Sequence, residues 1–295
     1  MVLFRVVNRS LTPSANLAQL LFKRSKSKQT KPSTHLFFPQ PSHPAANATQ
    51  KFPTSLFMKL FYCASWKCGS LFIFRFSKKI AEMTGTPLLS PNFKSDAPHY
   101  LKQSDIAAYQ FSQMSDYICS PVRSARFLPE TLKSSDVSII VHLRDPRDML
   151  VSSYFSVAFS HPKGPSLKIS DENRQKLRDT SIDEYVLKQR KRLQNIFEDF
   201  MELSRKRSDL LLVTYEEMVC DFPNYVHKIG EHIGLTDQQQ ELLINQFSDE
   251  FIIEEENHEN HKRRVIPGDH REKLQESTTT ELTEAFASHL DWLYD

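Results

Sequence analysis

Residues 64–76, ASWKCGSLFIFRF, join an apolar run to a segment of helical character through a short turn that contains a lysine and a glycine. The run before the turn predicts a buried strand over 56–65, and the residues after it predict a helix over 72–85 that ends at a glycine. A strand, a turn and a helix in this order can bind phosphate, because N–H groups at a helix start point towards an anion. The turn departs from the P-loop pattern, since Lys67 precedes its glycine, Gly69.

Charge is distributed unevenly along the 295 residues. Residues 1–57 hold eight Lys or Arg and no acidic residue, whereas 58–295 hold 30 basic and 36 acidic residues. The basic excess therefore lies in the first segment, and the overall charge does not indicate nucleic-acid binding. We expect 1–57 to be disordered or a targeting segment, and 58–295 to form the one domain. The expected location is the cytoplasm, or an organelle if the first segment is a transit peptide.

The four cysteines, at positions 63, 68, 119 and 220, show neither a C-x-x-C pair nor the spacing of a metal site. This pattern favours a reducing compartment over a disulfide framework. No run of about 18 apolar residues occurs, so no membrane span is expected.

Beyond the first helix, predicted strands alternate with predicted helices. A short strand is predicted over 116–121, buried strands over 136–143 and 209–215, and helices over 147–159, 181–207, 225–235 and 236–247. Residues 86–116 are expected to be irregular with a helical part near 104–116, and 160–180 to be a loop. This order predicts an α/β fold, a single domain in which helices flank a central parallel sheet.

Two further basic elements accompany the turn. Arg144 stands at the end of a predicted strand, where ligands bind in open α/β sheets, and Ser152 follows eight residues later in the next helix. Arginine offers paired donors to a phosphate, and serine adds a hydroxyl. Asp145 and Asp148 are expected to cap the helix or to pair with Arg147. The other element is a cluster, Lys262, Arg263 and Arg264, which would matter as a flap over a phosphorylated ligand.

These elements, together with VTYEEMVCDFPNYVHKIGEHIGL (213–235) and RRVIPGDHREKL (263–274), resemble sulfotransferases that use 3′-phosphoadenosine 5′-phosphosulfate (PAPS). The resemblance covers roughly residues 58–275 and implies a P-loop-like 5′-phosphosulfate turn made of Lys67, Cys68, Gly69, Ser70 and Leu71. It assigns the 3′-phosphate to Arg144, Ser152, Arg263 and Arg264, and places Tyr215 near the adenine. It also implies PAPS as co-substrate without a metal, and a small-molecule or glycan acceptor; the oligomeric state stays open.

The sequence departs from the family pattern in three places. The usual Pro-Lys-Ser-Gly-Thr turn reads WKCGS (66–70), and Val265 replaces a flap glycine. The family's Thr-His pair is absent, because the corresponding stretch ICSPVRSARFLP (118–129) contains no histidine. The base that deprotonates the acceptor is therefore unassigned, with His99 and Asp96 as candidates by position. A structural role is expected for His142, which lies within a strand.

The predicted function is transfer of a sulfuryl group from PAPS to a hydroxyl or amine. Lys67 would act catalytically by neutralising charge on the leaving phosphate. A P-loop kinase is disfavoured, because the turn lacks Gly-Lys-[Ser/Thr] and no Walker-B acidic strand end is evident. A nucleotide-binding protein without catalysis stays open because of the missing histidine. A nucleic-acid binder is the least favoured class.

Overall fold

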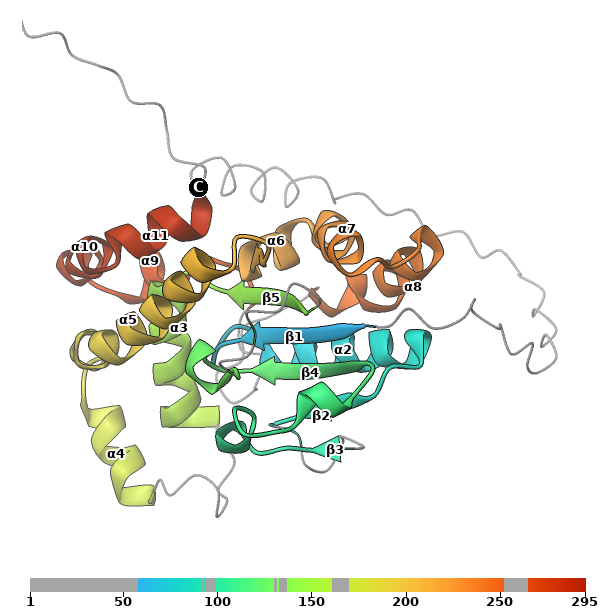
Figure 1. The fold of residues 1–295 in the computed structure, drawn as a ribbon. Helices are drawn as coiled ribbons and strands as arrows, with labels where there is room; N and C mark the ends of the chain where they lie inside the picture. The colour runs from blue at the N-terminus through green and yellow to red at the C-terminus, as the bar shows by residue number, and fades with distance from the viewer. Residues whose placement is uncertain are drawn as a thin grey trace, which may run out of the picture. The chain divides into compact units, whose positions relative to one another are not determined.

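Six parallel strands form the centre of the protein in the computed structural model (Figure 1). The structure describes residues 58–91, 93, 99–129, 132, 137–160, 170–251 and 265–295. The strand order is β3-β2-β4-β1-β5-β6, with bounds β1 Lys59–Ala64, β2 Leu88–Ser90, β3 His99–Tyr100, β4 Tyr117–Val122, β5 Ser138–Leu143 and β6 Leu211–Thr214. The predicted α/β class with a central parallel sheet is confirmed.

The helices account for most of the remaining described chain. Their bounds are α2 Ser70–Thr84, α3 Pro146–Phe155, α4 Asp171–Asp179, α5 Ile182–Lys206, α6 Tyr215–Cys220, α7 Phe222–Ile233, α8 Asp237–Phe247, α9 His270–Lys273, α10 Glu276–Ala285 and α11 Ala287–Tyr294. The predicted helix end at Gly85 is confirmed, since Gly85 is the left-handed C-cap of α2 with φ of 70°.

Several predicted segments need correction. The stretch 86–116 contains the short strands β2 and β3, and its helical part consists of two 3₁₀ turns, Gln103–Asp105 and Phe111–Gln113. The expected loop 160–180 contains α4, whose N-cap Ser170 accepts a hydrogen bond from the Asn173 N–H. The other corrections are smaller: α3 passes into a π-helix at Ser156–Ser160, and Tyr215 begins α6 instead of ending a strand.

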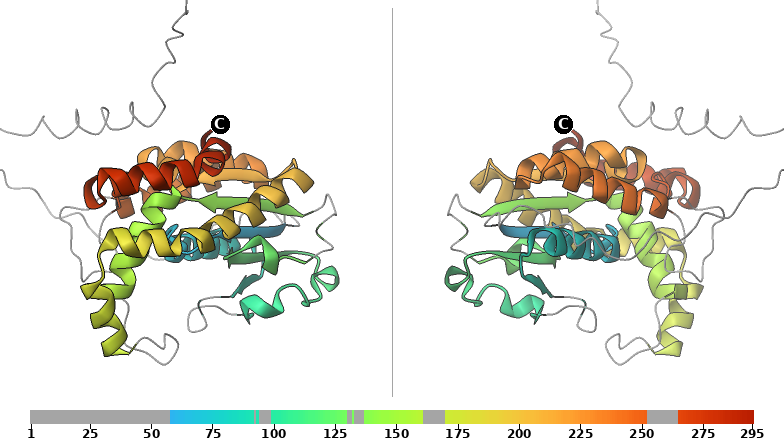
Figure 2. Two further views of the ribbon diagram at one scale, coloured as in Figure 1. Left: turned by 90° about the vertical axis from the view of Figure 1, so that its left-hand side faces the viewer. Right: turned by 90° about the vertical axis from the view of Figure 1, so that its right-hand side faces the viewer.

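Alternate residues of each central strand pack into two separate hydrophobic layers. Leu60, Tyr62 and Ala64 of β1 face the layer that contains α2, α7 and α8. Phe61 and Cys63 face the opposite layer, which contains α3, α5, α10 and α11. This alternation follows from the two-residue period of a strand. Helices therefore cover both faces of the sheet, as Figures 1 and 2 show.

The register of the two central strands brings their following loops together. β1 and β5 are neighbours, and Ala64 at the end of β1 pairs with His142 near the end of β5. The arrowheads of β1, β4 and β5 point to the same side in Figure 1. The turn after β1 and the residues after β5 thus lie at the same edge of the sheet, where open α/β sheets bind ligands.

Three general features of the described residues bear on the predictions. All four cysteines are free, and Cys63, Cys68 and Cys119 are buried. Across the described ranges, no helix combines the length and apolar character needed to cross a membrane. Those same ranges contain no group of three His, Cys, Asp or Glu side chains arranged to hold a metal ion. The predictions for residues 1–57, Asp96, Arg263 and Arg264 lie outside the described residues.

Candidate active site

The turn between β1 and α2 has an unusual backbone. Lys67 and Gly69 both adopt left-handed conformations, with φ of 65° and 76°. Glycine takes this conformation without strain, whereas a lysine seldom does. A Cβ on Gly69 would lie 3.5 Å from both the Tyr215 ring and the Met218 side chain. A side chain at position 69 would therefore be strained, and the turn lies close against α6.

The start of α2 leaves backbone donors for a ligand. The Ile73 N–H donates to the Gly69 carbonyl at 3.0 Å, so the N–H groups of Ser70, Leu71 and Phe72 precede the first helical hydrogen bond. The helix dipole adds partial positive charge at this end, and the first turn contains no acidic residue. This end of α2 is consequently suited to an anion.

Cys68 contributes to the turn through its backbone. Its side chain is fully buried, and its Sγ lies 3.7 Å from the Met149 Sδ in α3. Burial raises the pKa of the Cys68 thiol well above its ordinary value. The thiol is therefore part of the core, and only the peptide groups of Cys68 can take part in ligand binding.

Arg144 follows β5 directly and is only 4% exposed. Its guanidinium lies 4.3 Å from the centre of the Tyr215 ring, and its Nη2 lies 3.5 Å from Asp148 Oδ2. Burial alone would lower the pKa of Arg144, but at the high pH where arginine titrates the charges of Tyr215, Asp148 and Glu216 outweigh it, so the pKa lies above its ordinary value. Its Nε is buried and has no hydrogen-bond partner among the described residues. Arg144 thus offers a cation with an unused donor.

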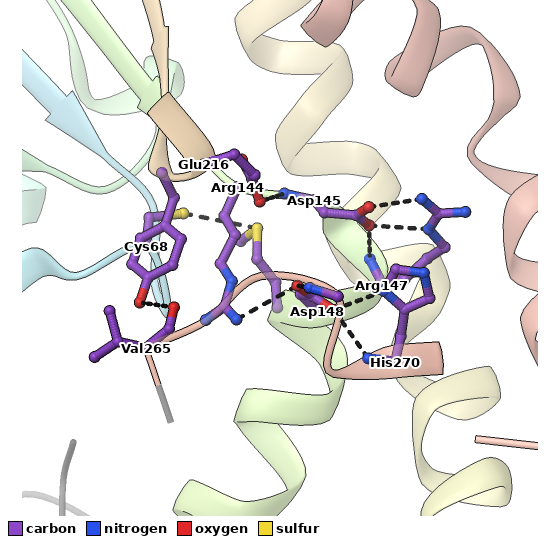
Figure 3. Close-up of polar contacts among 11 residues, drawn as sticks. Cys68, Arg144, Asp145, Arg147, Asp148, Glu216, Val265 and His270 are labelled. Carbon is purple, nitrogen blue, oxygen red and sulfur yellow. Dashed lines mark hydrogen bonds and ion pairs between the residues drawn. The ribbon is translucent and has the colours of Figure 1, made fainter. Parts of the chain in front are cut away.

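Asp148 joins Arg144 to the segment that follows the basic cluster. It accepts hydrogen bonds from the Gly268 N–H at 2.7 Å, the His270 N–H at 3.0 Å and His270 Nδ1 at 2.6 Å (Figure 3). Burial by itself would raise the pKa of Asp148, but the His270 hydrogen bond and the Arg144 charge hold it well below its usual value. The Tyr215 hydroxyl also donates to the Val265 carbonyl at 3.0 Å. Four hydrogen bonds, three to Asp148 and one from Tyr215, therefore fix this segment beside Arg144.

Two acidic residues beside Arg144, Asp145 and Glu216, have different partners. Asp145 caps α3 and holds Arg147, with 2.6 Å between its Oδ2 and Arg147 Nη2. Glu216 accepts from the Asp145 N–H at 3.1 Å, and burial followed by the charge of Asp145 raises the Glu216 pKa to about 8. Glu216 is therefore largely protonated at neutral pH, and the positive charge of Arg144 is not cancelled by it.

The profile described as "Sulfotransferase domain" matches residues 60–293. The chain belongs to the sulfotransferase family. Its fold is similar to mouse sulfotransferase SULT7A1 complexed with PAP, with 18% identity, a TM-score of 0.56, and coverage of 80% of this chain and 85% of the other. It is also similar to retinol dehydratase in a complex with retinol and PAP, with 15% identity, a TM-score of 0.51, and coverage of 80% and 82%. No curated protein sequence matches the chain significantly.

The sulfotransferase brings several predicted site residues together. Tyr215 lies beside Arg144 and close to the turn at Gly69, so it links the two elements that are predicted to bind anions. Ser152 lies in α3 one turn beyond Asp148, and residues at this spacing share a face of a helix. Lys67 is half-buried within the turn itself. The adenine assignment of Tyr215 and the phosphate assignment of Ser152 stay predictions.

The sulfotransferase fold does not bring His99 to the turn. His99 is exposed in the edge strand β3, and strands β2 and β4 lie between β3 and β1. Three strand spacings correspond to about 14 Å. His142 is fully buried, and burial lowers its pKa to about 3, in agreement with the structural role expected for it. The base stays a prediction.

The contacts of Asp148 were not expected from the sequence. Asp145 caps α3 and pairs with Arg147, as one expectation had it, whereas Asp148 contacts Arg144 and His270. The short separation of Arg144 and Asp148, four residues across the start of α3, was a usable signal, although Arg144 itself precedes the N-cap Asp145. No such signal links Asp148 to His270, which lies 122 residues away.

Proposed function

We propose that this sulfotransferase takes its sulfuryl group from PAPS and transfers it to a hydroxyl or amine of a small molecule or glycan. One observation carries the choice of donor: the buried Arg144, with its unused Nε, lies at the same sheet edge as the donor-rich start of α2. PAPS carries phosphate at both its 3′ and its 5′ position, so it can engage both elements. PAP in the similar structures, and the small molecules retinol and androsterone in complexes of retinol dehydratase, are consistent with this choice.

Different residues of the site would bind the 5′-phosphosulfate and the 3′-phosphate of the nucleotide. Backbone N–H groups at the start of α2 would hold the 5′-phosphosulfate, and Lys67 would neutralise charge there. Arg144 would bind the 3′-phosphate through charge-assisted hydrogen bonds, with Asp148 fixing its position. Because Arg144 is buried and stays charged, its interaction with a phosphate is screened less than a surface contact would be.

The reaction is a substitution at sulfur. The acceptor oxygen or nitrogen forms a bond to sulfur while the bond from sulfur to the 5′-phosphate oxygen breaks, and adenosine 3′,5′-bisphosphate (PAP) departs with that electron pair. The acceptor proton passes to a base that stays unassigned, because Asp96 lies outside the described residues and His99 lies three strands away from β1. Lys67 would act most strongly on the bridging oxygen, because negative charge grows there in the transition state.

A transfer assay tests this function. Labelled PAPS is incubated with the protein and a panel of phenols, aliphatic alcohols, amines and glycans, and both labelled product and released PAP are measured. The proposal predicts labelled product with at least one acceptor class and one PAP released per transfer. Tight PAP binding without release of PAP from PAPS with any acceptor would instead support a non-catalytic nucleotide-binding protein.

The location is a separate proposal. We place the protein in the cytoplasm, unless residues 1–57 direct it to an organelle. Free, buried cysteines are consistent with a reducing compartment. Comparing fluorescent fusions of the full chain and of residues 58–295 tests this, because only a targeting segment would make their distributions differ.

A further inference from the structure

A chain of buried hydrogen bonds lies directly beneath the turn. It contains Tyr62 from β1, His142 from β5 and Tyr225 from α7, all with no exposed surface. His142 Nε2 lies 3.0 Å from the Cys68 carbonyl oxygen, and His142 Nδ1 lies 3.0 Å from the Tyr225 hydroxyl. The Tyr225 hydroxyl is in turn hydrogen-bonded to the Tyr62 hydroxyl. The chain thus connects two strands and a helix to one peptide group of the turn.

The hydrogen bonds have a single consistent direction. A carbonyl oxygen only accepts, so His142 Nε2 carries the proton and donates to Cys68. Nδ1 of the neutral ring is then an acceptor, so the Tyr225 hydroxyl donates to it, and the Tyr62 hydroxyl donates to Tyr225. Burial keeps the pKa of His142 near 3, so the ring stays neutral at ordinary pH. Tyr225 therefore selects the tautomer that His142 needs to hold the turn.

The Cys68 carbonyl determines where a neighbouring donor points. It belongs to the peptide group between Cys68 and Gly69. Because a trans peptide is planar with its C=O and N–H in opposite directions, a carbonyl held towards His142 turns the Gly69 N–H away from the sheet core. Glycine takes φ of either sign, so position 69 by itself does not fix this orientation. The hydrogen bond from His142 supplies the missing constraint.

The apolar surroundings of His142 indicate that its buried imidazole has a specific role. His142 lies on the face of β5 that also presents Ile140 to an apolar layer. A buried polar ring there costs free energy unless its hydrogen bonds are satisfied, and both of its nitrogens have partners. An aliphatic residue would fill such a position without this requirement, but it would leave the Cys68 carbonyl without its donor.

We propose that His142, oriented by Tyr225 and Tyr62, is a positioning residue that directs the Gly69 N–H towards the 5′-phosphate of the bound nucleotide. The proposal rests on the proposed function, since it takes the turn as the 5′-phosphate site. His142 acts only through the Cys68 peptide and does not touch the ligand. Its effect is accordingly confined to ligands that carry a 5′-phosphate.

Comparing two ligands distinguishes an effect of His142 on the 5′-phosphate site from a general loss of protein stability. PAP carries both phosphates, whereas adenosine 3′-monophosphate lacks the 5′-phosphate and contacts only the Arg144 end. By isothermal titration calorimetry, His142→Leu should weaken PAP binding roughly tenfold or more, as expected for a charge-assisted hydrogen bond lost from the site. The affinity for adenosine 3′-monophosphate should change less than about twofold. His142→Gln restores an N–H donor and should recover most of the PAP affinity.

Tyr225→Phe provides an independent variant that keeps the shape of the core. It removes the donor to His142 Nδ1 and leaves the ring free to change tautomer, so PAP affinity should fall by a smaller factor with the same ligand selectivity. If His142→Leu does not fold, Tyr225→Phe decides the question. The positioning role would be overturned if folded His142→Leu or Tyr225→Phe bound PAP with unchanged affinity. Equal losses of affinity for PAP and for adenosine 3′-monophosphate would overturn it as well. A wild-type protein that does not bind PAP would refute the proposed donor itself.

Discussion

Replacing Arg144 with alanine separates the two ends of the proposed nucleotide site. Arg144 is the buried cation at the end of β5, and its Nε has no partner among the described residues. Loss of its charge-assisted hydrogen bonds to the 3′-phosphate should cost about 1.5–3 kcal/mol of binding free energy. This corresponds to a dissociation constant for PAP that rises roughly 10- to 150-fold. AMP has no 3′-phosphate, so its affinity should change little.

The same substitution also affects folding, and the structure bounds that effect. Asp148 loses a buried cation 3.5 Å away but keeps three donors, from the Gly268 N–H and from the N–H and Nδ1 of His270. The loss of stability should therefore stay at about 1–3 kcal/mol, below the range for a buried charge left without any partner. Thermal unfolding followed by circular dichroism should show a lowered but still cooperative transition.

Arg147→Ala is the matched control for Arg144→Ala. Arg147 belongs to the same segment but pairs with Asp145 and donates to Thr283 Oγ1 at 2.8 Å. Titration calorimetry with PAP and AMP should show an unchanged affinity ratio in this variant. Equal losses of PAP and AMP affinity in Arg144→Ala, or the same PAP loss in Arg147→Ala, would refute the assignment of Arg144 to the 3′-phosphate.

Three further outcomes follow from the site and the domain boundary. Glu216 has a folded pKa of about 8 against an ordinary 4.5, so its contribution to stability is full below pH 4.5 and is lost as the pH rises through 8. Chemical unfolding of Glu216→Gln between pH 5 and 8 should accordingly show a pH slope less negative by up to about 1.4 kcal/mol per pH unit, and a parallel slope would contradict the raised pKa. Asp148→Asn keeps the shape of the side chain but replaces one acceptor oxygen by an NH₂ donor that faces the Gly268 or the His270 N–H. The free energy of unfolding should therefore fall by about 2–4 kcal/mol. An unchanged melting temperature would show that Asp148 does not hold this segment in place. A chain that starts at Met58 should keep the melting temperature and PAP affinity of the full chain; precipitation or loss of binding would show that residues 1–57 belong to the fold.

The central strands and their glycine-bounded helix were predictable because local sequence determines them. The apolar run before the turn predicted β1, and Gly85 correctly marked the end of α2, whereas the helix begins at Ser70, two residues before the predicted start. Strands β2 and β3 were not predicted, since three and two residues are too short to show a two-residue period. Helix α4 was missed because its residues, mostly charged, carry no apolar stripe.

The site was predictable only where sequence spacing carries geometric information. Arg144 could be placed at a strand end from the apolar run before it. The contact between Tyr62 and Tyr225, 163 residues apart, depends on how α7 packs on the sheet, which no local pattern specifies. The same holds for the bond from His142 to the Cys68 carbonyl, because it arises from the register of β1 and β5.

Turnover of labelled PAPS by Lys67→Ala tests the central claim most directly, namely that sulfuryl transfer occurs at the turn between β1 and α2. The variant and the wild type are compared with the best acceptor of the panel, and PAP affinity is measured in parallel. The account predicts that kcat falls about a hundredfold or more while the dissociation constant for PAP rises less than about tenfold, because the lysine charge matters most in the transition state. Wild-type turnover in Lys67→Ala would contradict the account.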